Sequence, residues 1–164
     1  MSAIAGLSCF IDASRTPSRR QSRRLESKED FKKRLKDSVV DRDVAVGDVD
    51  LPASVDEIAN QMKDLNMAID SKKRQSIFRY TLMGRNMEEV QKRKGKHFIE
   101  YCHQYLPKES YSRSQIYFLI KLHKVALTYC KLIRVSVPIG VLKSKFKLVE
   151  QLCQEEKDYW IDPL

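Results

Sequence analysis

Glycine is scarce in this chain, which has 5 glycines among 164 residues, and no close pair of cysteines occurs. The low glycine content argues against a turn-rich β-sandwich and against a collagen-like chain. No apolar run approaches the roughly 18 to 20 residues that span a bilayer, so we expect no membrane partner. The cysteines lack the short spacing of zinc ligands, so we predict no metal site and reduced thiols at Cys9, Cys102, Cys130 and Cys153.

Motifs of the common enzyme classes are also missing. The chain has no nucleophile elbow and no glycine-rich phosphate loop. The carboxylates of Glu88 and Glu89, and those of Glu155 and Glu156, are adjacent in the sequence. Neighbouring side chains diverge by about 100° on a helix, so neither pair converges on one substrate atom. We therefore expect a protein that is not an enzyme and that needs no cofactor.

Positive charge is in excess. The chain carries 31 Lys and Arg against 22 Asp and Glu, a formal net charge of +9, and 42% of its residues are hydrophobic. Residues 15–36 hold ten basic and three acidic side chains, and residues 72–147 hold eighteen basic and four acidic ones. This balance favours nucleic acid as a partner. Residues 37–50 are acidic, and one hypothesis is that they fold back on the basic core and mimic DNA.

Residues 1–52 show no sustained hydrophobic period, which predicts a disordered arm with a basic and an acidic part. A short helix at 28–36, with Phe31 and Leu35 four residues apart, is not expected to bury much. The densest basic cluster predicts nucleic-acid contacts or a nuclear-localisation signal. It consists of Arg19, Arg20, Arg23 and Arg24. A solvated tail without a receptor and a mitochondrial targeting segment at 14–24 are the alternatives.

Helical order is expected to begin at Ser54, because residues 54–57 form a capping box before an apolar face. That face consists of Ile58, Met62, Leu65 and Ile69. A second helix is expected at 72–92, where Gly84 predicts a close helix crossing. Its apolar face consists of Ile77, Tyr80, Met83, Met87 and Val90. Gly95 then supplies a left-handed cap, and a third helix begins at Phe98.

A longer helix is predicted up to Leu132, with Ser112 as its N-cap and Gln115 at the third helical position. Most of its circumference is apolar, so it is expected to lie largely inside the domain. The side chains expected to be buried are Ile116, Phe118, Leu119, Ile120, Leu122, Val125, Leu127, Tyr129 and Cys130. A narrow basic stripe without acidic residues is expected to stay exposed. It consists of Arg113, Tyr117, Lys121, Lys124, Thr128 and Lys131. Cations for phosphates beside side chains that donate to base edges are typical of a DNA-reading helix.

A last helix is expected near Pro138, which is tolerated in a first turn because the N–H that it lacks would have no partner there. The apolar face of this helix consists of Ile139, Leu142, Phe146, Val149 and Cys153. Trp160 is expected to plug the core rather than to stack on bases.

The order of these pieces resembles that of helix-turn-helix DNA-binding proteins of phages, plasmids and eukaryotic mobile elements, over residues 77–160. The resemblance is carried by Tyr80, Gly84 and Arg85, by the junction 94–98, and by residues 111–117. It implies that the helix after the serine-rich turn faces DNA. The residues that it implies in reading or holding DNA are Ser112, Arg113, Ser114, Gln115, Tyr117 and Lys121, with Lys124, Lys94 and Lys96 beside them.

The sequence therefore predicts an all-α protein, in which a disordered arm at 1–52 precedes a small helical bundle at 53–164 with a helix-turn-helix-like unit. We expect it to bind DNA without catalysis, with RNA, a homodimer or a protein partner as further possibilities. The expected location is the nucleus, if the source is eukaryotic or the host has one, and otherwise the cytoplasm. The alternative is a viral or mobile-element adaptor that docks on a protein while its arm binds nucleic acid non-specifically.

Overall fold

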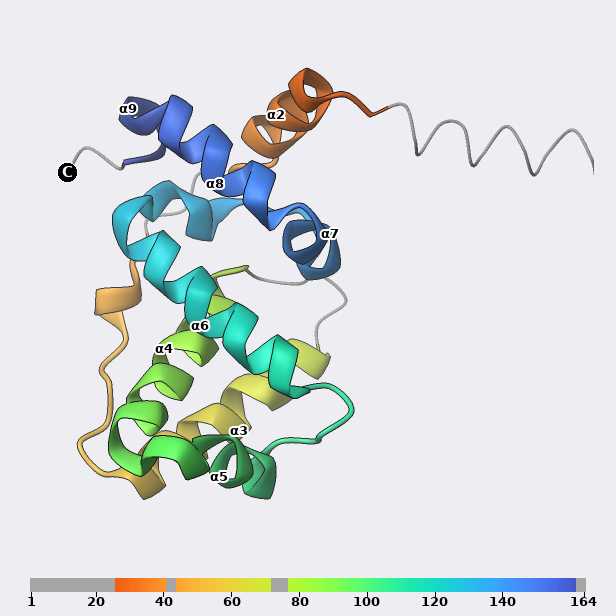
Figure 1. Cartoon of the computed structure of the whole chain (residues 1–164). Helices are drawn as coiled ribbons and strands as arrows, with labels where there is room; N and C mark the ends of the chain where they lie inside the picture. The colour runs from red at the N-terminus through yellow and green to blue at the C-terminus, as the bar shows by residue number, and fades with distance from the viewer. Residues whose placement is uncertain (1–25, 41–43, 72–76, 162–164) are drawn as a thin grey trace, which may run out of the picture. The chain divides into compact units, whose positions relative to one another are not determined.

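The computed structural model describes residues 26–40, 44–71 and 77–161, and these residues form helices and connecting segments without a strand (Figure 1). The predicted all-α class is thereby confirmed. The α-helices are α2 (Lys28–Asp37), α3 (Val55–Ser71), α4 (Ile77–Lys94), α5 (Phe98–Tyr105), α6 (Arg113–Thr128), α7 (Ile139–Ser144), α8 (Phe146–Glu155) and α9 (Lys157–Trp160). Three 3-10 turns are also present, η1 (Val46–Asp48), η2 (Gly95–His97) and η3 (Cys130–Arg134). The four predicted arm contacts, at residues 19, 20, 23 and 24, lie outside the described residues.

The chain divides into two compact units, Met1–Arg34 and Leu35–Leu164. In the described part of the smaller unit, the Asp30 amide donates to Ser27 Oγ over 3.1 Å at the start of α2, and Arg34 pairs with Glu26 over 3.1 Å. The short helix was expected at 28–36, and α2 occupies nearly the same residues. The expectation that it buries little was wrong, because Phe31 and Leu35 have no exposed surface.

Order in the larger unit begins earlier than residue 53, where the sequence placed it. The Val40 amide donates to the Arg134 carbonyl over 2.8 Å, and the Ser136 amide donates to the Ser38 carbonyl over 3.1 Å. Backbone bonds of this kind hold an extended segment without a hydrophobic period. The sequence pattern therefore could not show that residues 35–53 belong to the folded unit.

Helix α3 begins where its capping residues predict, since the Glu57 amide donates to Ser54 Oγ over 3.1 Å. Its apolar face packs inward, with Ile58 and Met62 fully buried and Ile69 8% exposed. Helix α4 confirms its predicted face as well, because all five of its expected core residues are buried. Gly95 follows α4 with φ at +60°, the left-handed conformation expected of a C-terminal cap.

Helices α4 and α6 cross at Gly84, as its position predicted. A Cβ atom added to Gly84 would lie 1.9 Å from the Leu119 carbonyl oxygen and 2.6 Å from its carbonyl carbon. These are backbone atoms of α6, which cannot move aside as the end of a side chain can. Glycine at this position therefore sets how closely the two helices approach.

Helix α6 starts as predicted and ends earlier. The Gln115 amide donates to Ser112 Oγ over 3.3 Å, which confirms Ser112 as the N-cap. The helix stops at Thr128 rather than at 132, and the chain continues as the 3-10 turn η3. The predicted burial of Leu127 and Cys130 was wrong, because Leu127 is 60% exposed and Cys130 is also exposed. Packing on that side of α6 ends with the helix.

The C-terminal region is broken into short helices where the sequence suggested a single one. Pro138 is the N-cap of α7, and Lys145, with φ at −113° and ψ at 23°, separates α7 from α8. The predicted apolar face is nevertheless buried, from Ile139 to Cys153. Trp160 is 1% exposed and packs edge-on against Tyr159, which confirms its role as a plug of the core.

The three cysteines in the described residues carry free thiols, as expected of reduced side chains. Burial raises the pKa of both the Cys102 and the Cys153 thiol to about 12, so these two side chains stay protonated and unreactive near neutral pH.

Replacement of Gly84 by alanine is expected to destabilise the fold by about 3 kcal/mol, because the new methyl group meets the α6 backbone. Gly140→Ala is the matched control, since nothing lies within 4 Å of a Cβ at that helical position. The control should leave stability unchanged or raise it by up to about 1 kcal/mol. Urea denaturation followed by circular dichroism measures both. Equal midpoints for Gly84→Ala and the unsubstituted protein would contradict the close crossing.

Candidate nucleic-acid interface

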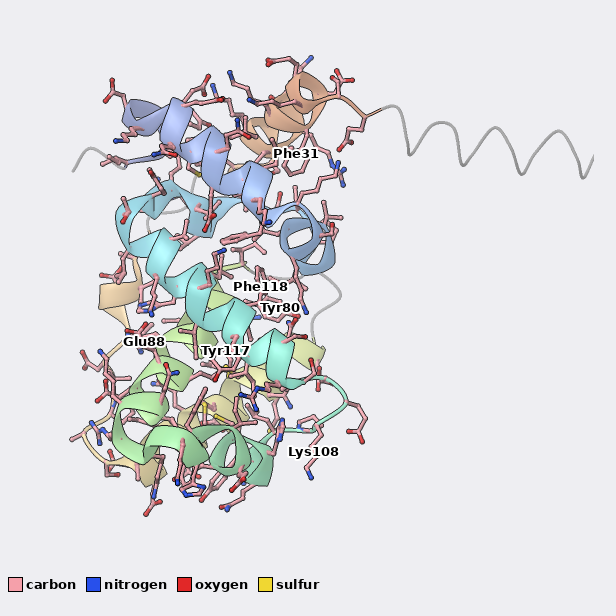
Figure 2. The ribbon with its side chains drawn as sticks, viewed as in Figure 1. Phe31, Tyr80, Glu88, Lys108, Tyr117 and Phe118 are labelled. Atoms are coloured by element: carbon pink, nitrogen blue, oxygen red, sulfur yellow. The ribbon has the colours of Figure 1, made fainter. Side chains whose placement is uncertain are left out.

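One side of α6 is exposed along the whole helix. Its residues are Arg113, Tyr117, Lys121, Lys124 and Thr128, here called the α6 stripe. The opposite side packs inward, where Ile116, Leu119 and Leu122 have no exposed surface, whereas Tyr117 is 41% exposed. Figure 2 labels Tyr117 on α6. Lys131, which was expected in the same row, lies in η3 and holds its ammonium 4.1 Å from the centre of the Tyr159 ring. The exposed row is thus shorter by one residue than predicted.

Tyr117, the second residue of the stripe, is held in place by its neighbours. Its ring meets the buried Phe98 ring edge-to-face, with centroids 5.6 Å apart and an interplanar angle of 86°. The guanidinium carbon of Arg113 lies 5.7 Å from the centroid of Tyr117. A cation near an aromatic face is attracted by the negative charge above the ring. The first two members of the stripe therefore form a unit that α5 supports through Phe98.

Acidic side chains from neighbouring helices lie beside the lysines of the stripe. Lys121 Nζ is 3.4 Å from Glu150 Oε1 of α8. The charge of Lys124 acts on Glu88 of α4 and, behind larger effects, helps to lower the pKa of that carboxyl. The stripe itself lacks acidic residues, as predicted, and the fold adds the carboxylates of α4 and α8 beside it. Exposed pairs of this kind are weak, at about 0 to 1 kcal/mol, so a charged partner can compete for these lysines.

Gln115, predicted to read bases, does not lie on the stripe. It lies two positions from both Arg113 and Tyr117, which turns it about 200° away on the helix. It is half-buried, and its Oε1 accepts a hydrogen bond from Lys143 Nζ of α7 over 3.0 Å. Ser114 is exposed at the start of α6, with its Oγ 3.2 Å from Ser112 Oγ.

Lys94 and Lys96 are both exposed at the end of α4 and in η2. Lys94 Nζ lies 4.7 Å from the centroid of the Tyr101 ring. Phe98 follows η2 directly, and its ring contacts the ring of Tyr117. This contact brings η2, with Lys96, toward the stripe.

Sequence reasoning missed two lysines that contact residues described above. Lys92 pairs with Glu88 over 3.5 Å, one turn apart on α4, and Lys143 holds Gln115. The spacing of Lys92 and Glu88 was a readable signal, because side chains four residues apart on a helix are neighbours. The contact of Lys143 had no such signal, because it depends on how α7 packs beside the start of α6.

Beneath the stripe, the buried His123 of α6 pairs with the half-buried Glu88 of α4, with 3.2 Å between Nδ1 and Oε2. His123 is 7% exposed. Burial lowers the pKa of His123 despite the hydrogen bond to Glu88, and the charges of Arg85 and Lys92 lower it further. The pKa of Glu88 is also below its ordinary value, because the hydrogen bond and the nearby cations together outweigh the opposing effect of its burial.

Helices α5 and α6 lie on either side of the serine-rich turn. The segment between them runs from residue 106 to residue 112, which is seven residues, where the helix-turn-helix motif uses three or four. The most extensive packing of α6 is on α4 rather than on α5. The stripe is therefore supported by a crossed helix pair together with the Phe98 contact.

Comparisons of the chain with models of protein families, with curated proteins and with solved structures find no match. Each helix in the described residues is too short or too polar to cross a membrane. In the same residues, no three His, Cys, Asp or Glu side chains gather as ligands for a metal ion. The surface chemistry of α6 and its neighbours is therefore the basis for inferring function.

The fold is expected to lose stability as the pH falls from about 7.5 to about 5.5, on either side of the ordinary histidine pKa. The pKa of His123 is lower in the fold than in the unfolded chain, so the unfolded chain takes up a proton first and acid favours unfolding. Urea denaturation at both pH values, compared between the unsubstituted protein and His123→Gln, isolates this residue from His97 and His103. An equal loss in both proteins would contradict the assignment. Glu88 adds a similar loss only at lower pH, since its pKa is also depressed.

Proposed function

We propose that this chain is a non-enzymatic nucleic-acid-binding protein, with duplex DNA as its first candidate ligand. The observation that carries the proposal is the α6 stripe, an exposed basic row on a helix whose opposite side is fixed by the core. From Arg113 to Lys124 the row covers eleven helical steps, about 16 Å at a rise of 1.5 Å per residue. That length matches roughly five base-pair steps of 3.4 Å along one DNA strand.

The stripe supplies the two kinds of contact that a duplex requires. The ammonium groups of Lys121 and Lys124 can pair with phosphates, because a compact charge on a flexible side chain attracts a phosphate without requiring one fixed geometry. Arg113 has a planar guanidinium, held beside Tyr117, that suits a guanine edge or a phosphate in two-point contact. Lys94 and Lys96 extend the basic surface, and the basic arm at residues 19–24 adds further phosphate contacts in this proposal. The helix-turn-helix resemblance implies the same orientation, with α6 toward the DNA, although the segment between α5 and α6 is longer than the turn of the motif.

Phosphate binding by the stripe is tested with the full chain and a labelled duplex, by fluorescence anisotropy between about 50 and 200 mM salt. Arg113→Gln with Lys121→Gln should weaken binding about tenfold. It should also reduce the slope of log K against log salt by about two, since each neutralised phosphate contributes about 0.9.

The matched control is Lys63→Gln with Lys157→Gln, which removes the same charge from exposed positions on α3 and α9. An equal loss in this control would show attraction by net charge alone and would contradict a defined face. A third variant replaces the four arginines at residues 19, 20, 23 and 24 by glutamine. If this variant alone loses nearly all binding, the adaptor with a packaging arm is the correct alternative.

Sequence preference is a separate prediction, tested by selecting duplexes from a random pool with the unsubstituted protein and two variants. Arg113→Ala should relax the preference at one position and cost about 1 to 3 kcal/mol on the selected site. Gln115→Ala should change the preference little, because Lys143 already holds its amide oxygen. Failure of the unsubstituted protein to enrich any sequence would contradict a reading function and leave non-specific phosphate binding.

A further inference from the structure

Residues 44–53, here called the strap, lie along α4 with little apolar contact. No residue of the strap is buried, although several are half-exposed. Figure 1 shows this segment leading past α4 to the start of α3. It carries two acidic side chains, Asp48 and Asp50, and no basic one. Segments with few buried apolar contacts open at low free-energy cost.

Side-chain donors hold the strap by its backbone carbonyl groups. Arg85 Nη1 donates to the carbonyls of Val46, over 3.1 Å, and Val49, over 2.5 Å. The Asp50 carbonyl accepts from Gln61 Nε2 of α3 over 3.2 Å. Arg93, two turns after Arg85 on α4, donates to the Ala53 carbonyl. Neutral carbonyl oxygens therefore occupy Arg85, whereas Arg93 divides its donors between the Ala53 carbonyl and the Glu89 carboxylate, which lies 3.0 Å from its Nε.

Two buried polar atoms of α4 have no hydrogen-bond partner among the described residues. They are Arg85 Nε and Asn86 Oδ1. The Nε edge of a guanidinium is one of the edges that bind two oxygens of a phosphate at once. Arg85 is also close enough to α6 for its charge to act on His123, so the covered surface adjoins the helix that bears the stripe.

We propose that the strap is a displaceable cover and that Arg85 and Arg93 beneath it form a second phosphate-binding site for the nucleic acid. This inference rests on the proposed function and adds a regulated contact to it. A phosphate offers charged oxygens, which form stronger hydrogen bonds with a guanidinium than carbonyl oxygens do. When the strap leaves α4, its two carboxylates are also removed from the basic surface. Nucleic acid therefore competes with the strap for the same two arginines.

Asp48 offers a way to loosen the strap without changing α4. Its Oδ2 accepts from the Ala45 amide over 3.0 Å and closes the η1 turn that presents two carbonyls to Arg85. Asp48→Ala removes this acceptor and should open the strap. Asp48→Asn is the matched control, because its amide oxygen keeps an acceptor at the same place while the charge is lost.

The experiment measures duplex affinity, its salt dependence and amide hydrogen exchange of the full chain. Asp48→Ala should bind the duplex about three- to tenfold more tightly than Asp48→Asn, with a salt slope steeper by one to two. Adding Arg85→Gln to Asp48→Ala should abolish the gain. The amides of Asp48 and Val49, which bond within η1, should exchange faster in Asp48→Ala. In the unsubstituted protein they should exchange faster when duplex is bound.

Three outcomes would overturn this inference without affecting the proposed function. The proposed function is still supported in those cases if Arg113→Gln with Lys121→Gln weakens binding. The first outcome is unchanged exchange of these two amides at saturating duplex. The second is equal affinity of the two Asp48 variants, and the third is a gain that survives Arg85→Gln. If neither the unsubstituted protein nor Asp48→Ala binds nucleic acid, the proposed function and the inference both fail. Binding by Asp48→Ala alone would support the covered site.

Discussion

The crossing of α4 and α6 is the contact on which the larger unit depends. Gly84 lets the Leu119 carbonyl come so near that any side chain at this position would collide with the α6 backbone. Close approach of two helices brings their flanking side chains into dense contact. The fully buried residues Met83, Met87, Leu119 and Leu122 come from these two helices. Because α6 is fixed by one side, its other side is presented to solvent as a straight basic row.

The same crossing holds the polar pair of His123 and Glu88, and this pair joins the core to the electrostatics of the surface. Glu88 faces His123 within the core, and it also attracts Lys92 and Lys124 near the solvent. One carboxylate thus reduces the positive field at the end of the stripe, and Glu150 does the same near Lys121. Weak pairs of this kind position lysine side chains and still leave them available to a stronger anion.

Local signals in the sequence predicted much of the fold. Ser54 and Ser112 mark helix starts because their hydroxyl groups accept local amide donors, and Gly95 marks a helix end because glycine adopts positive φ easily. Buried faces followed from helical spacing. The end of α6 was not predictable in this way, since an apolar pattern continues through residues 129–133 while the backbone changes to a 3-10 turn.

The candidate site was predicted less well, because its composition depends on neighbours that are distant in the sequence. Exposure of Arg113, Tyr117 and Lys121 follows from helix geometry, and so does the turn of Gln115 away from them. The hydrogen bond of Gln115 with Lys143, 28 residues later, does not. The strap shows the same limit more strongly. Its acidic residues suggested attraction to the basic core through carboxylates, but Arg85 and Arg93 of α4 donate to its carbonyl groups. Every residue has a carbonyl group, so composition cannot reveal which ones bind an arginine. Charge in a sequence therefore indicates the class of partner, while the packing of the helices determines which cationic side chains can bind that partner.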